Sequence, residues 1–452
     1  MDVALHALNR FGLGARIGER SGMTDPRGWV LDQLRRPPPL LAPDRLAGAD
    51  PFAALREVRA AQAAGDMAAL ARARRGMTRI VAAEMEAALT RRLETDAPVL
   101  ERLVSFWSNH LCVSSAGKVV VTALAGAYER EAIRPHVLGR FEDMVLASAS
   151  HPAMLTYLDN AQSIGPRSRA AQQRRPGAQR AVRGLNENYA RELLELHTLG
   201  VDGGYTQQDV QELARVLTGW TVAGLPGRAR AGDDNLRFAF EPLLHEPGAK
   251  VVLGVRYAEA GIEEGRRAIR DLCRHPATGR FIGHKLVRHF IADEPPQAAV
   301  DAVARVFTDT EGDLRATVAA LVERTEAWNG VERKFRTPQD WVVAVLRALD
   351  AGRAATLPAQ LRQLRHPLWS PPAPNGFGDT TREWADPDSL LNRAELARTI
   401  ARRMPPGFDP RTLLDVVETT AADPLRSVLA DARISVDERI SLAVAAPAFQ
   451  WR

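Results

Sequence analysis

The segment 186–200, NENYARELLELHTLG, is the densest group of side chains able to transfer protons or hold anions. Spaced at about 100° per residue, as in an α-helix, its polar residues share one arc. These residues are Glu187, Asn188, Arg191, Glu192 and Glu195. Paired carboxylates can divide acid and base roles, and an arginine can hold an anion. The alternative is a solvated face, on which Arg191 forms i,i+4 ion pairs worth about 0.3–0.5 kcal/mol each.

The same helical wheel argues against a metal site formed by Glu192, Glu195 and His197. His197 falls in the middle of the opposite, apolar arc, so we expect a hydrogen-bonded histidine in the core. The chain has neither the Glu-x-x-His pairs of di-iron bundles nor a His-Glu-x-x-His sequence. The sequence therefore leaves the metal and the cofactor unknown.

Two further residues complete the candidate catalytic set, His110 and Lys285. His110 lies near Trp107 on the apolar arc of segment 101–118, where a buried imidazole needs partners for its ring nitrogens. It either supports the core or acts as a catalytic histidine in a dry site. Lys285 and His289 are four residues apart and share one cationic helix face.

A proline-rich segment, 368–397, carries the rigid aromatic side chains Trp369, Phe377 and Trp384 between its turns. Asn375-Gly376 predicts a tight turn, and Asp386-Pro387 predicts a helix start. Aromatic side chains of this kind either anchor a ligand or close a core.

The elements that must position these residues are predicted to be helical almost throughout. Helix formers or helical periods cover 52–93, 98–113, 136–149, 185–199, 206–219, 276–292, 311–326, 338–350, 388–403 and 435–446. Asp25-Pro26 and Asp50-Pro51 predict capped helix starts. Only 237–240 and 251–255 read as strands, which we expect to pair as one small hairpin. The predicted fold is a large all-α body with one β-hairpin insertion.

The length of 452 residues exceeds the ~250–300 at which a single core stops growing. We expect one helical domain over 1–452, or two lobes that meet near the 186–200 helix. Segment 160–184 is rich in arginine and has neither an acidic residue nor apolar periodicity. It predicts a mobile surface loop, which is either a solvated insertion or a binding site for an anionic partner.

Composition excludes several classes of protein. The 60 basic and 55 acidic residues give a net charge of +5, which is too small for this length to indicate nucleic-acid binding. The longest apolar run, 119–127, is about half of the ~20 residues that a membrane span needs. No N-terminal signal sequence is recognisable, so a cytoplasmic location is expected. Cys112 and Cys273 lack metal-binding spacing and are expected to be core thiols.

Lysine is scarce in this chain. Only Lys118, Lys250, Lys285 and Lys334 are lysines, and every other basic residue is arginine. Such a bias is typical of a GC-rich genome. Because ammonium and guanidinium groups differ in shape and ease of deprotonation, the remaining lysines mark positions that require this side chain, unless they survive by chance.

Eight blocks of sequence, taken together and in order, resemble a bacterial family. They are HALNRFGLGA (6–15), FWSNHLCVS (106–114), EREAIRPHVLGRF (129–141), HPAMLTYLDNAQS (151–163), NENYARELLELHTLGVDGGYTQQDVQELARVLTGW (186–220), HEPGAKVVLG (245–254), KLVRHF (285–290) and NGFGDTTREWADPDSLLNR (375–393). The family is called domain of unknown function 1800, and the resemblance covers nearly the whole chain. Departures include Glu246, where many relatives have Asp, and Phe377, where Trp is commoner.

The resemblance implies an all-helical fold but no established activity. Members are frequently encoded beside a second family, domain of unknown function 1501, which is related to sulfatases and alkaline phosphatases and often carries export signals. By this analogy the protein works in the cytoplasm or leaves with a signal-bearing partner. Relatives often have Phe at the position of His197, which agrees with a core position.

Two hypotheses of function follow. The first is an enzyme of unknown reaction, whose polar cleft is built on the 186–200 helix with His110 and Lys285 nearby. The second is a non-catalytic binding or assembly partner of a sulfatase-like or alkaline-phosphatase-like protein.

Overall fold

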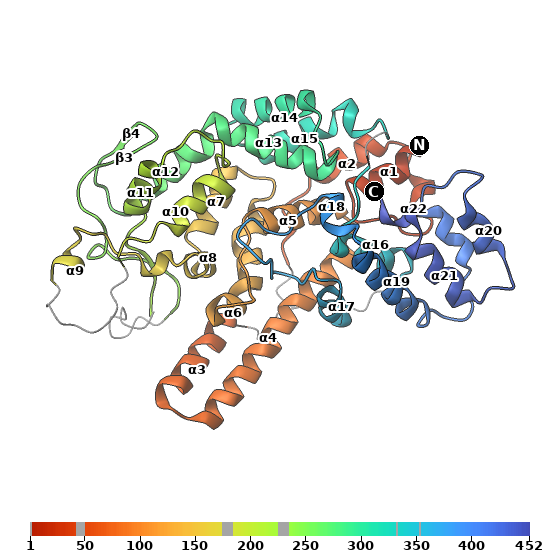
Figure 1. Cartoon of the computed structure of the whole chain (residues 1–452), viewed down its shortest axis with the longest axis horizontal. Helices are drawn as coiled ribbons and strands as arrows, with labels where there is room; N and C mark the ends of the chain where they lie inside the picture. Colours follow the sequence, from red (N-terminus) through yellow and green to blue (C-terminus); the bar gives the residue numbers. More distant parts are fainter. Residues whose placement is uncertain (1, 42–49, 174–183, 225–234, 331–332, 352–353) are drawn as a thin grey trace.

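The computed structural model describes residues 2–41, 50–173, 184–224, 235–330, 333–351 and 354–452. In this part of the chain helices dominate, and short strands form two separate sheets. Figure 1 shows an elongated body from which one long helical hairpin, α3–α4, projects. The all-α class predicted from the sequence is confirmed, and each helical segment predicted above contains a helix.

The first helices begin where the Asp-Pro pairs predict them. Asp25 and Asp50 accept backbone N–H groups as the N-caps of α2 and α3, and the following proline starts each helix. The helices of this region are α1 (Val3–Arg10), α2 (Pro26–Leu34), α3 (Pro51–Ala64), α4 (Met67–Glu94), α5 (Pro98–His110), α6 (Val119–Tyr128), α7 (Phe141–Ala149) and α8 (Pro152–Tyr157).

The run of helix formers in 52–93 forms two helices rather than one. Gly65 ends α3 with φ of 70°, a left-handed conformation that glycine adopts without strain. Asp66 then caps α4 by accepting the backbone N–H groups of Ala68 and Ala69, each at 2.9 Å. The two helices pack through a small apolar cluster of their own, Val58, Ala61, Leu70 and Ala73.

The middle of the chain carries both sheets. Its elements are α9 (Arg169–Gln172), α10 (Asn188–Glu192), α11 (Gln207–Val216), β1 (Trp220–Val222), β2 (Phe238–Phe240), β3 (Lys250–Val252), β4 (Val255–Tyr257), α12 (Ile262–Arg274), α13 (Pro276–Phe290), α14 (Gln297–Asp309) and α15 (Leu314–Val322).

The predicted pairing of 237–240 with 251–255 is wrong. Strand β2 pairs antiparallel with β1, and β3 pairs with β4 across a tight turn. The residues of β1 fall within or next to a helical period, and a strand of three residues is too short to display an alternation of its own. The sequence therefore offered no partner for β2.

The C-terminal part returns to helices, which are α16 (Pro338–Ala348), α17 (Leu357–Gln363), α18 (Thr381–Trp384), α19 (Pro387–Ala401), α20 (Pro424–Ala430), α21 (Val436–Ala445) and α22 (Pro447–Gln450). The remaining helical turns are η1 (Glu19–Gly22), η3 (Glu129–Ile133), η4 (Arg134–His136), η5 (Asn160–Gln162), η6 (Leu193–His197), η7 (Thr325–Ala327), η8 (Ala354–Thr356) and η9 (Pro410–Asp415). Two of these, η3 and η6, are π-helical.

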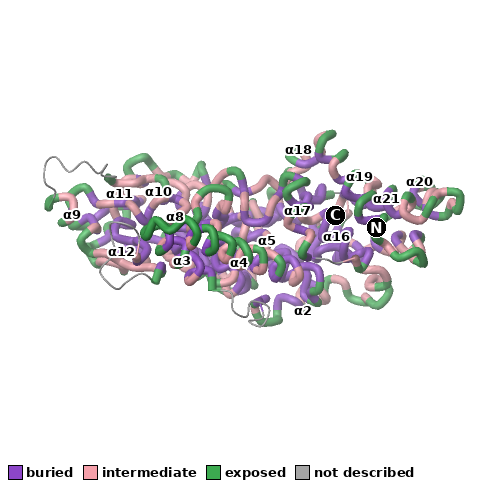
Figure 2. Tube along the Cα trace, turned by 90° about the horizontal axis from the view of Figure 1, so that it is seen from below, coloured by how far each residue is buried: buried purple, intermediate pink, exposed green. Residues whose placement is uncertain are grey.

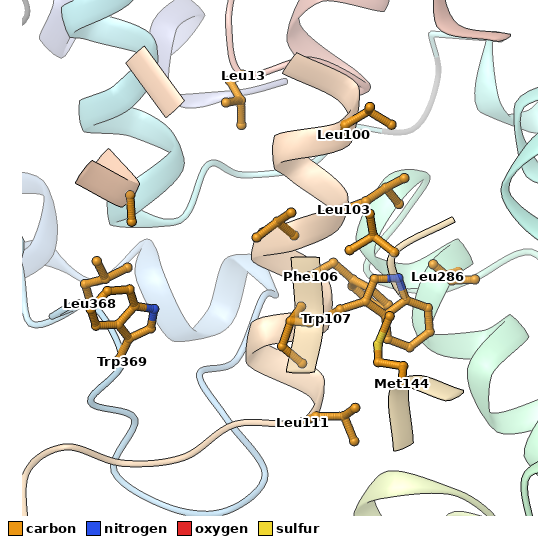
Figure 3. Packing of buried hydrophobic residues seen from close by; sticks show 14 of the residues in the cluster. Leu13, Leu100, Leu103, Phe106, Trp107, Leu111, Met144, Leu286, Leu368 and Trp369 are labelled. Atoms are coloured by element: carbon orange, nitrogen blue, oxygen red, sulfur yellow. The ribbon is translucent and has the colours of Figure 1, made fainter. Parts of the chain in front are cut away.

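One continuous cluster of buried apolar side chains extends from Leu5 in α1 to Phe449 in α22. Figure 2 shows buried segments running through the length of the body, with exposed residues on its outer surface. Helix α5 lies at the centre of this core. In Figure 3, Trp107 of α5 lies beside Met144 and Leu286, while Trp369 lies on the other side of the helix. Trp107 is fully buried.

The Arg-rich segment 160–184 is described only in part, since 174–183 lie outside the described residues. In the described part, Arg167 donates from its backbone N and from Nε to the buried carboxylate of Glu246, at 2.8 and 2.7 Å. This arginine is therefore held by the protein itself. The predicted mobility of the loop and the division into lobes stay predictions.

Candidate functional site

A cavity of about 410 Å³ lies between α5, α13, the start of α16 and the proline-rich segment 368–397. This volume lies in the range of pockets for small ligands. Helix α5 contributes Phe106 and His110, and α13 contributes Lys285 and Arg288. Of the candidate catalytic residues, the structure places His110 and Lys285 in this cavity.

His110 is buried and uses both ring nitrogens. Its Nε2 lies 3.1 Å from the carbonyl oxygen of His197, which can only accept, so Nε2 carries the proton. Its Nδ1 lies 3.0 Å from Nζ of Lys285 and is therefore the acceptor. Burial and the neighbouring Lys285 hold the pKa of His110 well below its usual value. The imidazole is thus neutral, with its tautomer fixed by these two contacts.

Lys285 is half-buried in the wall of the cavity. Burial lowers the pKa of Lys285 to about 8, and Arg288 adds to the shift while Asp379 opposes it. Its Nζ also lies 5.5 Å from the centre of the Phe281 ring. A neutral lysine amine can still donate one N–H to His110 Nδ1, which leaves its lone pair free for a ligand. The arrangement suits a lysine that loses its proton near neutral pH.

Asp379 contacts α13 one turn after Lys285. One carboxylate oxygen lies 3.1 Å from Nδ1 of His289, and the other accepts from Nε of Arg288 at 3.0 Å. Burial opposes ionisation, but His289, Lys334 and Arg288 outweigh it and hold the pKa of Asp379 well below its usual range. Burial lowers the pKa of His289 to about 4. Its Nε2 has no hydrogen-bond partner among the residues that the structure describes.

The Asn375-Gly376 turn is clamped against the end of α5. Asn109 donates from Nδ2 to the carbonyl of Phe377 and accepts the backbone N–H of Phe377, both at 2.8 Å. Gly376 has φ of +80°, and a Cβ there would lie 2.5 Å from the backbone oxygen of Asn109. The rings of Phe377 and Trp384 pack on His366, with centres 4.1 and 4.8 Å away. The aromatic segment is therefore a fixed wall of the cavity.

The other candidate catalytic residues lie at the N-cap of α10 (Glu187), on α10 and on η6, outside the residues that line the cavity. Gln207 bridges two of them, since it donates to Glu187 at 2.6 Å and accepts from Arg191 at 2.8 Å. Arg191 also forms i,i+4 ion pairs with Glu187 and Glu195, each at 3.5 Å. The structure thus joins Glu187, Arg191 and Glu195 of the polar arc in one ion-pair network.

Two members of the arc stand out from that network. Partial burial and the neighbouring Glu195 raise the pKa of Glu192. Asn188 is exposed and donates from Nδ2 to the carbonyl of Leu158 at 3.4 Å.

The wheel that placed His197 assumed an unbroken α-helix, and this assumption is wrong for half of the segment. After Glu192 the backbone becomes the π-helix η6, whose wider turn changes the angle between successive side chains. The hydroxyl of Thr198 donates to the carbonyl of Leu193 at 2.6 Å and so satisfies a freed acceptor. His197 is buried, as predicted, although its Nε2 has no partner in the described part of the chain. Its carbonyl oxygen links this helix to the cavity through His110.

Several of the residues that line the cavity were not identified from the sequence. Asp379 and Arg288 lie in blocks that were noted, but nothing in their spacing shows that they meet. Cys112, expected to be a core thiol, is buried and also lines the cavity, with Sγ 3.2 Å from the carbonyl of Pro374. Burial raises the pKa of its thiol to about 12, so the thiolate is not available near neutral pH.

Among the described helices, none combines the length and apolar content needed to cross a membrane. Nor do the described residues contain a cluster of three or more His, Cys, Asp or Glu side chains able to hold a metal ion. No curated protein and no solved structure matches the chain. One family matches residues 6–451, and its description is "Protein of unknown function (DUF1800)". The chain therefore belongs to the DUF1800 family.

Proposed function

We propose that the protein is an enzyme that acts on a small molecule in this cavity, with the amine of Lys285 as the reacting group. The observation that carries the proposal is the contact between Lys285 and His110. A half-buried lysine beside a neutral imidazole, in a cavity of ligand size, is the arrangement expected of an amine that serves as base or nucleophile.

The role of His110 in this proposal is to position the amine. Because its Nε2 is bound to His197 and burial disfavours its cation, His110 does not take up the proton that Lys285 loses. Its Nδ1 accepts one N–H of Lys285 and thereby fixes the direction of the other N–H bond and of the lone pair on Nζ. The π-helix η6 supports the site because the carbonyl oxygen of its residue His197 accepts from Nε2 of His110.

Reactivity of the four lysines tests the proposal. The native protein is treated with a limiting amount of 1-fluoro-2,4-dinitrobenzene near pH 8, and the labelled peptides are identified by mass spectrometry. Lys250 and Lys334 are buried, and the side chain of Lys118 is 41% exposed. Exposure alone would make Lys118 the first to react, whereas the proposal expects Lys285 first.

Two matched variants complete the test. Lys285→Arg should remove the fast-reacting site, and Lys118→Arg should leave it unchanged. Faster labelling of Lys118 than of Lys285 in the folded wild type would argue against a reactive amine in the cavity.

A role of the polar arc in the reaction remains a second part of this proposal. The carboxyl group of Glu192, whose pKa is raised, is the member of the arc best suited to accept or donate a proton. The arc and the cavity are connected through His197, so substitutions in the arc can be tested against the same labelling assay.

The alternative is a non-catalytic partner of a sulfatase-like or alkaline-phosphatase-like protein, in the cytoplasm or exported with that protein. Exposed arginines on the projecting helix α4, namely Arg72, Arg75 and Arg79, favour an acidic partner surface (Figure 1). Co-purification of the two proteins, with cell fractionation, tests this alternative. Absence of co-elution at micromolar concentration would contradict it.

A further inference from the structure

The acidic side chains of the cavity are already engaged within the protein. Asp379 is bound by His289 and Arg288. Asp340 is bound by Arg102 at 3.2 Å and by Arg452 at 3.3 Å. The charges of these two residues are therefore balanced by neighbouring cations before a ligand enters. Glu383, which also lines the cavity, accepts from the backbone N–H and the hydroxyl of Thr380.

The cationic side chains are engaged only in part. Arg288 donates to Asp379 from Nε, and among the described contacts its two terminal nitrogens make no hydrogen bond. Its side chain is 35% exposed and lines the cavity, as Lys285 does. The two residues are three positions apart on α13, so their side chains are neighbours on one helix face. An amine and a guanidinium group thus face the same space.

Part of the remaining wall is apolar, beside polar residues such as Asn109 and Gln339. Phe106, Phe281 and Phe377 line the cavity, and the Lys285 amine lies over the Phe281 ring. These rings give a compact ligand with a short carbon skeleton an apolar surface to contact. The ligand that matches both groups carries an anionic group for Arg288 and an electrophilic carbon for Lys285.

We propose that the cavity binds a 2-oxo acid, with its carboxylate on Arg288 and its oxo carbon at Nζ of Lys285, and that the two condense to an iminium. The inference rests on the proposed role of Lys285 and adds the class of substrate. In the step, the lysine nitrogen forms a bond to the oxo carbon, and the carbon–oxygen bond breaks. The Lys285 ammonium and the oxo acid give the iminium and one molecule of water, without any other reactant.

A 2-oxo acid fits because its carboxylate and oxo carbon are adjacent. Arginine binds carboxylates through paired N–H donors, for which the terminal nitrogens of Arg288 are available. The amine three residues earlier then meets the neighbouring carbon. A neutral ketone offers the same carbon but no group for the guanidinium.

Reductive trapping tests the inference. The full-length protein is incubated with pyruvate and sodium cyanoborohydride, which reduces an iminium to a stable amine, and the alkylated lysine is located by mass spectrometry. Butanone in place of pyruvate is the neutral comparison. We expect the adduct on Lys285, formed at least about tenfold faster with pyruvate than with butanone.

Two variants on α13 separate anion binding from other effects. Arg288→Gln should bring the rates for pyruvate and butanone close together, while Arg280→Gln, an exposed arginine of the same helix, should change neither. Labelling of Lys285 by 1-fluoro-2,4-dinitrobenzene in Arg288→Gln shows whether the amine is still in place.

The outcomes distinguish the two proposals. If Lys285 reacts with fluorodinitrobenzene but forms no adduct with pyruvate, the substrate class is wrong and the reactive amine stands. Equal rates for pyruvate and butanone in the wild type would also overturn the choice of an anionic substrate. If Lys285 reacts with neither reagent, the proposed function and this inference fail together.

Discussion

Nζ of Lys285 lies 3.0 Å from Nδ1 of His110, although 175 positions separate the two residues in the chain. The contact joins α13 to the end of α5, and the second ring nitrogen of His110 extends it to the carbonyl of His197. Three segments noted separately in the sequence therefore meet at one imidazole.

The ionised form of Lys285 is expected to destabilise the fold. Its pKa of about 8 in the folded protein lies below the ~10.4 of a lysine in the unfolded chain. Well below pH 8 the charged ammonium therefore lowers the free energy of unfolding by the full amount, about 3 kcal/mol. Between these values the folded protein has lost the proton that the unfolded chain keeps, and the cost declines as the pH rises. Lys285→Met should thus be more stable than the wild type at pH 7, by urea denaturation, and lose this advantage above about pH 10.5.

Lys118→Met is the control for this measurement. Lys118 is partly exposed and forms an ion pair with Asp159 at 2.8 Å, so its loss should bring no gain at pH 7. A Lys285→Met variant whose difference from the wild type stays constant over the same pH range would contradict the lowered pKa.

Arg134→Leu should be strongly destabilising. Arg134 is completely buried and binds the buried carboxylates of Glu101 at 2.8 Å and Glu129 at 2.7 Å. Its removal leaves Glu101 with only Arg91, and Glu129 with only Arg92, as ion-pair partners among the described residues, each at 3.4 Å. Breaking a buried ion pair in this way typically costs about 3–5 kcal/mol. The free energy of unfolding measures the effect. Arg35→Leu, at a side chain 75% exposed, should change it by less than about 1 kcal/mol.

Gly376→Ala tests the clamp that fixes the aromatic wall of the cavity. The new Cβ would lie 2.5 Å from the backbone oxygen of Asn109, at a φ of +80° that strains any residue with a side chain. We expect a loss of at least about 1–3 kcal/mol and slower reaction of Lys285. Gly117→Ala, with open space around its Cβ, is the control and should be nearly neutral. Equal stability of the two variants would rule out the clamp.

Lys250→Arg should impair folding more than an exchange at the surface. Lys250 is 2% exposed, and its Nζ lies 3.0 Å from Glu264 and 3.2 Å from His245. The larger planar guanidinium cannot take the place of the ammonium there without moving its neighbours. Thermal unfolding should show a decrease of several degrees. Arg256→Lys, at an exposed residue of the neighbouring strand β4, serves as the comparison. A similar small decrease in both variants would show that position 250 does not require a lysine.

Glu192→Gln separates the polar arc from the cavity. Glu192 does not line the cavity, so labelling of Lys285 in this variant should stay within about twofold of the wild type. Turnover of a substrate by the same variant then reports on the arc alone. Loss of turnover in a folded variant with a normally reactive Lys285 would assign the chemistry to the arc as well.

The four lysines show what residue composition can and cannot predict about a site. Each of them makes a specific contact, Lys118 with Asp159, Lys250 with Glu264, Lys285 with His110 and Lys334 with Asp293. Rarity alone could mark these positions, but it could not tell an ion pair in the core from an amine in a cavity. That difference depends on which residues from other segments face each lysine.

Helices and their starts were predictable because their causes are local. Asp25 and Asp50 cap helices through their own neighbours in the sequence. Asp66 caps α4 in the same way, although this break within 52–93 was not predicted. The π-helix at Leu193–His197 was not predictable from the sequence. The two kinds of helix share the same residue preferences and differ only in whether the hydrogen bonds span four residues, as in an α-helix, or five, as in a π-helix. The partner of β2 was not predictable either, because pairing of three-residue strands depends on the surrounding fold.

The candidate site was predictable only in its parts. His110 was identified as a buried histidine in need of partners, and Lys285 as part of a cationic face. Their meeting, and the approach of Asp379 to His289, depends on long-range packing of α5, α13 and the proline-rich segment. Local periodicity does not encode such distances.

The most direct test of the central claim is the pH dependence of the labelling of Lys285 by 1-fluoro-2,4-dinitrobenzene in the native protein. Its rate, followed by mass spectrometry from about pH 6 to about pH 11, is compared with that of Nα-acetyl-lysine amide. The account predicts a midpoint at about pH 8 for Lys285. A midpoint near 10.4, the pKa of an ordinary lysine, would contradict it.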